Sequence, residues 1–183
     1  MKSNEELGFW QGLYNEGRLE EVRQIDYRDN FRHYPSWTTQ EGKGLEVGSG
    51  LLSMLEFSKK DVISIDPLMD EYDKIYKHDG LERIAMDGEN LEFGDNTFDF
   101  VVNINVIDHT PNPDKMLSEI KRVLKPGGRL YFEVHFDKYL GGPHYMLWNR
   151  GVVKEYLKDF TLIINCVVGN GENQSKYYAE YTK

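Results

Sequence analysis

The run from Gly44 to Gly50, with the sequence GLEVGSG, most constrains the fold of this chain. Its apolar beginning predicts a short strand, and an acid, Glu46, precedes the glycine-broken turn that starts at Gly48. Glycine adopts backbone conformations that other residues avoid, so such a turn can bend sharply and approach a ligand closely. A helix that follows the turn would point its free N–H groups at the ligand. The pattern therefore predicts a strand, a ligand-binding turn and a helix, although dinucleotides, adenosyl cofactors and plain tight turns all use it.

Two further acids follow predicted strand ends. The apolar run 62–65 leads into Asp66 and Pro67, eighteen residues after Gly48. A carboxylate there can accept hydrogen bonds from both hydroxyls of a ribose, or it can cap the next helix, with the proline in the first turn. Asp87 comes before Gly88, just past another predicted strand end. Its carboxylate and the next backbone N–H match the edge of an adenine ring, and the alternative is a simple turn residue.

The order of glycine turn, ribose acid and adenine acid resembles the class I S-adenosylmethionine-dependent methyltransferases of the small-molecule type. The resemblance runs from about Lys43 to Phe136 and is strongest in the stretches 95–102 (DNTFDFVV), 105–111 (NVIDHTP) and 119–130 (EIKRVLKPGGRL). It implies an α/β fold, a three-layer Rossmann-like sandwich whose seven-stranded sheet is mostly parallel, with an antiparallel C-terminal strand.

One position departs from the family pattern, since Leu52 stands where the third glycine of the motif is usual. That glycine allows close packing of helix on strand, so we expect the first helix to shift outward or change register. The glycines at 48 and 50 remain, and we expect cofactor binding to be retained.

The resemblance also implies the site, residue by residue. The cofactor-binding residues that it predicts are Glu46, Gly48, Ser49, Gly50, Asp66, Pro67, Asp87, Gly88 and Asn105. Glu46 would position the methionine part of the cofactor or order the glycine loop, and the alternative is a solvated carboxylate. Asn105 would face the methionine end after the fourth strand.

Two histidines are candidate general bases. His109 follows Asp108 on the loop after the fourth strand, and His144 lies in the aromatic, glycine-containing loop 139–148. A histidine can take a proton from a substrate, and a neighbouring carboxylate raises its basicity. His109 can equally serve to tether its loop through hydrogen bonds to the backbone.

We expect one domain over residues 1–183, with an N-terminal helical cap (1–40), a cofactor-binding core (41–136) and a substrate loop with a C-terminal hairpin (137–183). Hydrophobic periodicity predicts strands over 43–47, 62–65, 83–85, 98–106 and 129–136, and helices over 51–57, 68–76, 114–124 and 152–157. Two apolar runs, 160–168 and 176–181, are joined by a polar glycine-containing turn and predict the hairpin. Phe31, Tyr34 and Trp37 could belong to a lid or to the core.

The amino-acid composition limits the kinds of partner and location that we expect for this chain. A net charge of -9 disfavours binding to nucleic acid, which depends on Lys and Arg. The polar N-terminus and the lack of an apolar run of about 20 residues predict no signal peptide, no membrane span and a cytoplasmic location. No clustered set of metal ligands stands out, so no metal is expected. Cys166 is the only cysteine, and its apolar surroundings predict a buried hydrophobe rather than a catalytic thiol.

The sequence thus predicts a methyltransferase that moves a methyl group from S-adenosylmethionine to an oxygen, nitrogen or carbon of a small molecule. Because the sulfonium donor is already activated, aligning the acceptor can supply roughly 7–11 kcal/mol, and a dedicated base is not essential. One alternative is a catalytically silent adenosyl-binding or interaction module. Another is a nicotinamide-dependent oxidoreductase, which shares the glycine turn but usually needs a second nucleotide-binding half. The oligomeric state is not predicted.

Overall fold

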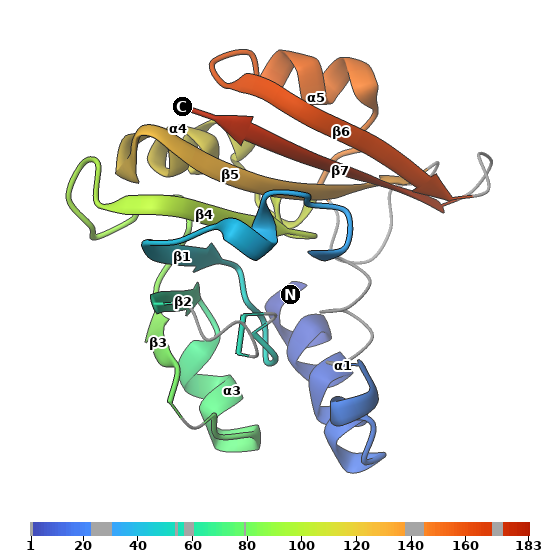
Figure 1. Ribbon diagram of the computed structural model, residues 1–183. Coiled ribbons are helices and arrows are strands. Elements are labelled where there is room, and N and C mark those ends of the chain that lie inside the picture. The colour runs from blue at the N-terminus through green and yellow to red at the C-terminus, as the bar shows by residue number, and fades with distance from the viewer. Residues whose placement is uncertain are drawn as a thin grey trace.

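The computed structural model describes residues 2–22, 31–53, 55–56, 61–78, 80–137, 145–169 and 174–183. A seven-stranded sheet in the order β3-β2-β1-β4-β5-β7-β6 forms its centre (Figure 1). The strands are β1 Lys43–Val47, β2 Asp61–Asp66, β3 Glu82–Ala85, β4 Phe98–Ile104, β5 Leu124–Asp137, β6 Thr161–Gly169 and β7 Gln174–Thr182. The helices are α1 Lys2–Asn15, α3 Met69–Ile75, α4 Pro113–Val123 and α5 Arg150–Tyr156, with short 3-10 helices η1 Trp37–Thr39 and η2 Ile107–His109.

Strands β1 to β5 pair in parallel, and β7 lies antiparallel between β5 and β6. Both the mostly parallel sheet and the antiparallel C-terminal strand are therefore as predicted. From β1 the chain adds β2 and β3 on one side of the sheet, and then adds β4 and β5 on the other side, so the strand order reverses between β1 and β4. This reversal is the point at which open α/β sheets bind ligands, beyond the carboxyl ends of the strands.

The two faces of the sheet bury separate sets of side chains. On β4, Val101 packs on the face covered by α4 and α5, while Phe100 and Val102 pack on the opposite face. Burial of each such side chain stabilises the fold by about 1.5–3 kcal/mol. Phe31, Tyr34 and Trp37 belong to this second cluster, with 6%, 2% and 4% of their surface exposed. They are core residues rather than a lid.

The predicted helix over 51–57 is wrong in its described part, where residues 51–53 and 55–56 form bends and turns. The Leu51 carbonyl accepts hydrogen bonds from the side chains of His78 and Arg83 rather than from the next helical turn. Leu51, Leu52 and Leu55 are all buried, although a single helix face could not bury the first two together. Among the described residues of this stretch no helix forms, so the expected outward shift of a helix does not describe this segment.

Other boundaries also moved. Strand β4 ends at Ile104, two residues early, because Asn105 has a positive φ of 55°. Strand β5 begins at Leu124, whereas the predicted strand begins at 129, so the Pro126-Gly127-Gly128 stretch lies within β5. The pairing of β5 with β4 shifts register between Phe98 and Phe100. Cys166 is half-buried on the edge strand β6 rather than buried, because that strand exposes most of its side chains.

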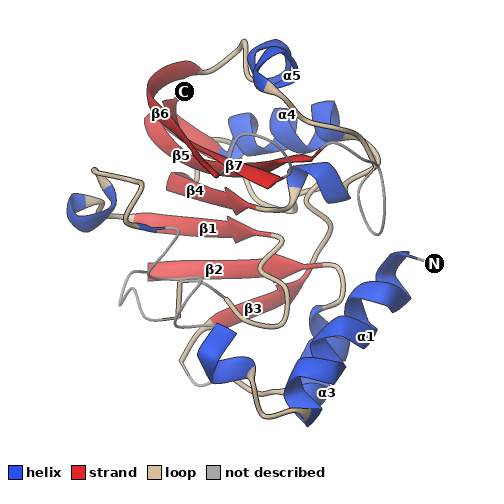
Figure 2. Cartoon of the chain, turned by 90° about the vertical axis from the view of Figure 1, so that its right-hand side faces the viewer, coloured by secondary structure: helices blue, strands red, loops and turns tan. Residues whose placement is uncertain are grey.

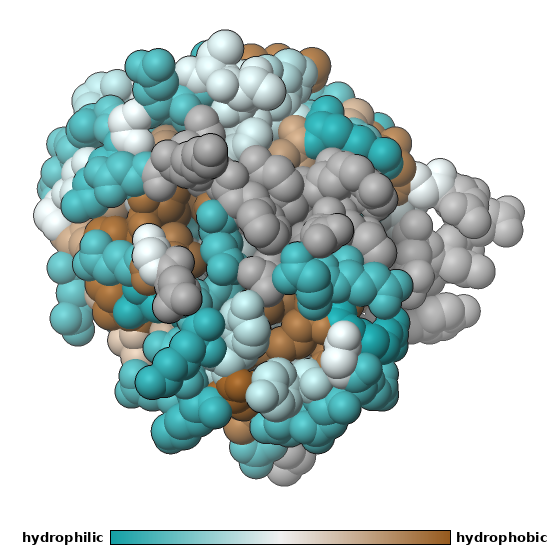
Figure 3. Space-filling view, turned by 60° about the horizontal axis from the view of Figure 1, so that its bottom comes forward, coloured by the Kyte–Doolittle hydropathy of each residue, from teal (hydrophilic) through white to brown (hydrophobic). Residues whose placement is uncertain are grey.

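Figure 2 shows α1 beyond the carboxyl ends of β1 and β2, beside α3. The lower side of the molecule, where α1 and α3 lie in Figure 1, has a largely hydrophilic surface with separate hydrophobic patches (Figure 3). The N-terminal segment therefore lies at the same edge of the sheet as the predicted site.

Candidate cofactor site

The glycine turn after β1 is held by the neighbouring strand. The backbone N–H groups of Gly48 and Ser49 both donate to the carbonyl of Ile65, at 2.8 and 3.0 Å. Gly48 has a φ of 74°, and a Cβ atom there would lie 2.4 Å from the Val106 side chain. Glycine is therefore required at this position for both conformation and space.

Asp66 lies at the end of β2 and faces this turn. Its Oδ2 accepts a hydrogen bond from the Gly50 N–H at 3.1 Å, and its Oδ1 accepts one from Leu68 N–H at 2.9 Å. Only 6% of the residue is exposed, and this burial raises the pKa of its carboxyl despite both hydrogen bonds. The structure brings the predicted ribose acid and the glycine turn together, and Pro67 follows on the surface.

Glu46 is 4% exposed, so the alternative of a solvated carboxylate is wrong. Its Oε2 accepts hydrogen bonds from the hydroxyls of Ser53 and, at 2.7 Å, Ser64. These contacts join β1, β2 and the segment after the glycine turn. They support the predicted role of Glu46 in ordering the glycine loop.

Asp87 is exposed and its Oδ1 accepts a hydrogen bond from Glu89 N–H at 2.8 Å, an arrangement found in turns. Gly88 is buried, and a Cβ atom there would lie 2.7 Å from the Val47 side chain. The absence of a side chain at Gly88 thus lets this loop approach the end of β1. The loop carries the predicted adenine acid to the same edge as Gly48.

Asn105 closes the site on the β4 side. Its N–H donates to the Glu133 carbonyl at 3.1 Å, and its buried Oδ1 has no hydrogen-bond partner among the described residues. A buried polar atom of this kind costs about 1–3 kcal/mol unless a ligand or water satisfies it. The next residue, Val106, packs against Gly48 and so connects the two loops.

His109 ends η2, with its Nε2 3.8 Å from Oδ1 of the buried Asp108. Its backbone N–H donates to Val106 at 2.8 Å, which fixes the loop relative to the glycine turn. The Asp108 carbonyl accepts a hydrogen bond from Tyr145 N–H at 2.7 Å, so the end of the aromatic loop contacts η2. The other predicted base, His144, lies outside the described residues.

Two polar groups near this edge were missed from the sequence. On β5, Glu133 is fully buried, and its Oε1 lies 3.3 Å from Nε2 of His135. The sequence did carry a signal for this pair, because an acid and a histidine stand two residues apart in an otherwise apolar strand. Residues at that spacing point to the same face of the sheet. On α1, burial and then the charge of Asp66 raise the pKa of the Glu6 carboxyl, and the sequence carries no signal for this interaction between distant segments.

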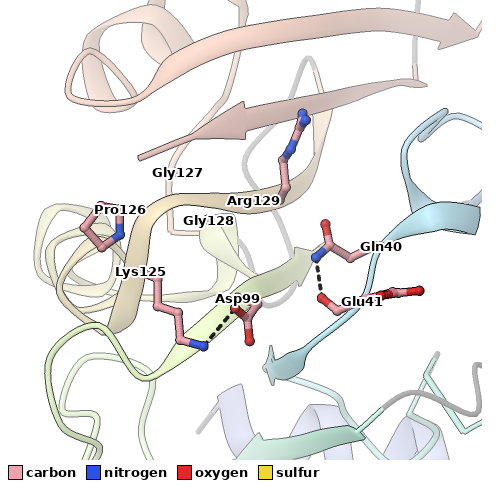
Figure 4. Close-up of a pocket in the computed structure, with 8 residues that line it drawn as sticks. All are labelled: Gln40, Glu41, Asp99, Lys125, Pro126, Gly127, Gly128 and Arg129. Atoms are coloured by element: carbon pink, nitrogen blue, oxygen red, sulfur yellow. Dashed lines mark hydrogen bonds and ion pairs between the residues drawn. The ribbon is translucent and has the colours of Figure 1, made fainter.

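A separate pocket of about 300 Å³ lies at the opposite end of the sheet (Figure 4). It is lined by Gln40, Glu41, Asp99, Lys125, Pro126, Gly127, Gly128 and Arg129. Lys125 Nζ and Asp99 Oδ1 form an ion pair at 2.8 Å inside it. This pocket contains no predicted site residue.

Within the part of the chain that the structure describes, no three His, Cys, Asp or Glu side chains are grouped so as to hold a metal ion. In the same described ranges, no helix has the length and apolar character needed to cross a membrane.

Known proteins are similar to this chain in sequence and in fold. Residues 45–132 match the family model described as "Methyltransferase domain". Uncharacterized protein MJ1123 of Methanocaldococcus jannaschii is 38% identical over 112 residues, 60% of this chain and 51% of that protein. The tRNA U34 carboxymethyltransferase of Campylobacter curvus is 31% identical over 98 residues, 51% of this chain and 33% of that enzyme.

Among solved structures, the fold is similar to Burkholderia thailandensis 1,6-didemethyltoxoflavin-N1-methyltransferase with bound 1,6-didemethyltoxoflavin and S-adenosylhomocysteine. The TM-score is 0.69 at 16% identity, over 99% of this chain and 88% of that one. At this identity the likeness concerns the fold alone.

Residues 45–132 thus match a methyltransferase domain, and the fold is that of the class I S-adenosylmethionine-dependent methyltransferases. Both findings agree with what the motifs predicted. The chain spans about half or less of the length of the first curated relatives that it matches.

Proposed function

We propose that this chain transfers a methyl group from S-adenosylmethionine to a small-molecule acceptor. The observation that carries the proposal is the hydrogen-bonded unit of Gly48, Gly50 and Asp66 at the edge where the sheet reverses its strand order. A buried carboxylate beside a glycine turn suits a ribose at this point of an α/β sheet.

The residues present fit the cofactor. The Asn105 Oδ1 is buried without a hydrogen-bond partner in the described part of the chain, and the next residue, Val106, contacts Gly48 of this unit. Asp66 would accept hydrogen bonds from the ribose, Asp87 would contact the adenine, and Asn105 would face the methionine end. Bound S-adenosylmethionine supplies an electrophilic methyl group on a sulfonium.

The chain's own contribution to chemistry is to align the acceptor and to accept its proton. The site would hold the nucleophilic atom of the acceptor in line with the methyl carbon, so that the new bond to the methyl group would form as the carbon–sulfur bond breaks and S-adenosylhomocysteine would be the leaving group. His109 would take the acceptor proton, with Asp108 stabilising the imidazolium that forms. His144 is the second proposed base, and His135 beside Glu133 is a third candidate.

The acceptor's class rests on composition. An acidic surface favours small or neutral acceptors over nucleic acid, which needs basic residues. A matched relative is nevertheless named for tRNA U34, so the acceptor screen has to include RNA. The division into a cap (1–40), a cofactor core and a substrate loop with hairpin (137–183) is part of the same proposal.

Calorimetric titration tests the proposal against its two rivals. We expect S-adenosylmethionine and S-adenosylhomocysteine to bind one-to-one and NAD not to bind. Comparable affinity for NAD would favour an oxidoreductase. Binding of both adenosyl ligands without methyl transfer to any of a panel of amines, phenols, thiols and tRNA would favour a silent binding module.

A further inference from the structure

Helix α1 packs directly on the glycine turn. A Cβ atom on Gly50 would lie 3.2 Å from the Trp10 indole, so the ring covers this glycine. Leu13 of α1 shares a buried cluster with Leu51, Leu52 and Tyr72. Leu52, which replaces the usual third glycine, therefore provides an apolar seat for α1 beside the turn.

This seat brings a second acid to Asp66. Burial and the charge of Asp66, in that order, raise the pKa of the half-buried Glu6 carboxyl on α1. The exposed residue beside it, Glu5, lacks this environment. Two acids close together repel each other unless hydrogen-bond donors offset their charges, and hydrogen bonds from the side chains of Tyr72 and Trp10 partly lower the pKa of Glu6.

The buried hydroxyl of Tyr72 on α3 belongs to the same group. It is fully buried, and a hydrogen bond with the Glu6 carboxyl is among the causes that raise its pKa. Burial and then the charges of Asp66 and Glu6 raise its pKa, so the hydroxyl lies near both carboxyls. Arg83 of β3 lowers the pKa of both Asp66 and Tyr72, and it also pairs with Asp73.

We propose that α1 completes the adenosyl site, with Glu6 as a second acid for the ribose hydroxyls opposite Asp66. A ribose diol supplies two O–H donors, and the three oxygen-bearing groups around it, Glu6, Asp66 and Tyr72, are the partners that such a diol needs. The adenosyl ligand then binds only when α1 is seated against Leu52. This inference rests on the proposed function, because it adds a residue to the same site.

The test compares Glu6→Gln with the matched control Glu5→Gln on the same helix. At pH 7 we expect Glu6→Gln to weaken S-adenosylhomocysteine binding by about tenfold or more, the usual loss for a hydrogen bond to a charged group. Glu5→Gln should stay within about twofold of the parent chain, the difference expected of an exposed charge. Circular dichroism and melting curves establish that both variants fold, and Glu6→Asp, which keeps the charge, should lose less affinity than Glu6→Gln.

Adenosine and 2′,3′-dideoxyadenosine serve as probes of the ribose contact. We expect Glu6→Gln to weaken adenosine binding but to leave dideoxyadenosine binding unchanged. Equal losses for both probes, or an affinity for S-adenosylhomocysteine equal to that of Glu5→Gln, would overturn the inference and leave the proposed function standing. A parent chain that does not bind S-adenosylhomocysteine would overturn both.

Discussion

Acidic side chains at the two ends of the parallel strands have carboxyl pKa values that are shifted in opposite directions. At the amino ends, Asp99 pairs with Lys125, and the hydrogen bond from that lysine lowers the pKa of its carboxyl. At the carboxyl ends, burial raises the pKa of Asp66 and of Glu6. An open pocket lies at the first end, and the glycine turns lie at the second.

The direction of the pKa shift distinguishes an acid that stabilises the fold from acids that are placed to bind a ligand. A carboxylate paired with lysine is stabilised in the folded chain, whereas a buried carboxyl beside another acid costs folding energy. Perturbed acids of the second kind concentrate at functional sites. The open pocket at the amino ends is thus a poorer guide to function here than the electrostatics of the carboxyl ends.

The largest effect should come from His109. In His109→Ala, we expect single-turnover methyl transfer to fall by about 10²–10⁴, because a general base is lost, while S-adenosylhomocysteine affinity stays nearly constant. The measurement follows formation of S-adenosylhomocysteine with an acceptor found in the screen. If His109→Ala keeps a near-parental rate and His135→Gln loses activity instead, then His135 on β5 is the general base and His109 is not.

A pair of glycines sharpens the comparison. Gly48 and Gly127 both have positive φ, 74° and 76°, but only Gly48 has a side chain, Val106, within reach of a new Cβ. Both alanine variants incur strain of about 1–2 kcal/mol, and Gly48→Ala should lose a further 1–3 kcal/mol or so through overpacking. Denaturant unfolding measures both. Equal losses would show that Val106 moves aside without cost.

The acids at the carboxyl end should reduce stability at neutral pH. Because its folded-state pKa is raised, Glu6 contributes stability below its ordinary value of 4.5, and this is lost as pH rises through the folded-state pKa. The Glu6→Gln variant has no carboxyl group to ionise at this position, so it does not lose this stability as pH rises. We expect its Tm at pH 7 to exceed the parent's by up to about 4 °C, with the gain vanishing in acid. Melting curves of Glu5→Gln, which should show no such trend, provide the control.

The smallest effect is expected at the amino end, with the opposite sign. The lowered pKa of Asp99 means that its stabilisation is present above its ordinary value of 3.8 and is lost as pH falls through the folded-state value. Asp99→Asn should cost less than about 1 kcal/mol at pH 7, because the pair is partly exposed to solvent. The cost should disappear below the folded-state pKa. A constant difference at all pH values would show that the charge of Asp99 is not the cause.

The strands of the sheet could be predicted because the residue pattern that specifies each strand lies within its own stretch of sequence. The apolar runs that become β1, β2 and β4 have the right length and order, and the turn after β1 needs glycines that the sequence displays. The hairpin of β6 and β7 was equally visible, because two apolar runs flank a polar turn.

The site's surroundings could not be predicted because they depend on distant contacts. The segment after Gly50 has a helical pattern, yet His78 and Arg83 take the Leu51 carbonyl and Ser53 turns inward to Glu46. These partners come from β1 and from the segment 78–83. The approach of Glu6 to Asp66 likewise depends on how α1 packs, and tertiary packing of this kind overrides local propensity.

One titration tests the central claim that the carboxyl end is the adenosyl site. S-adenosylhomocysteine is titrated into the parent chain, Asp66→Ala and Asp99→Ala, which remove one aspartate from each end of the sheet. We predict one-to-one binding to the parent, a loss of about 1–3 kcal/mol in Asp66→Ala, and an affinity within about twofold of the parent in Asp99→Ala. Unchanged affinity in Asp66→Ala, or an equal loss in Asp99→Ala, would contradict the account.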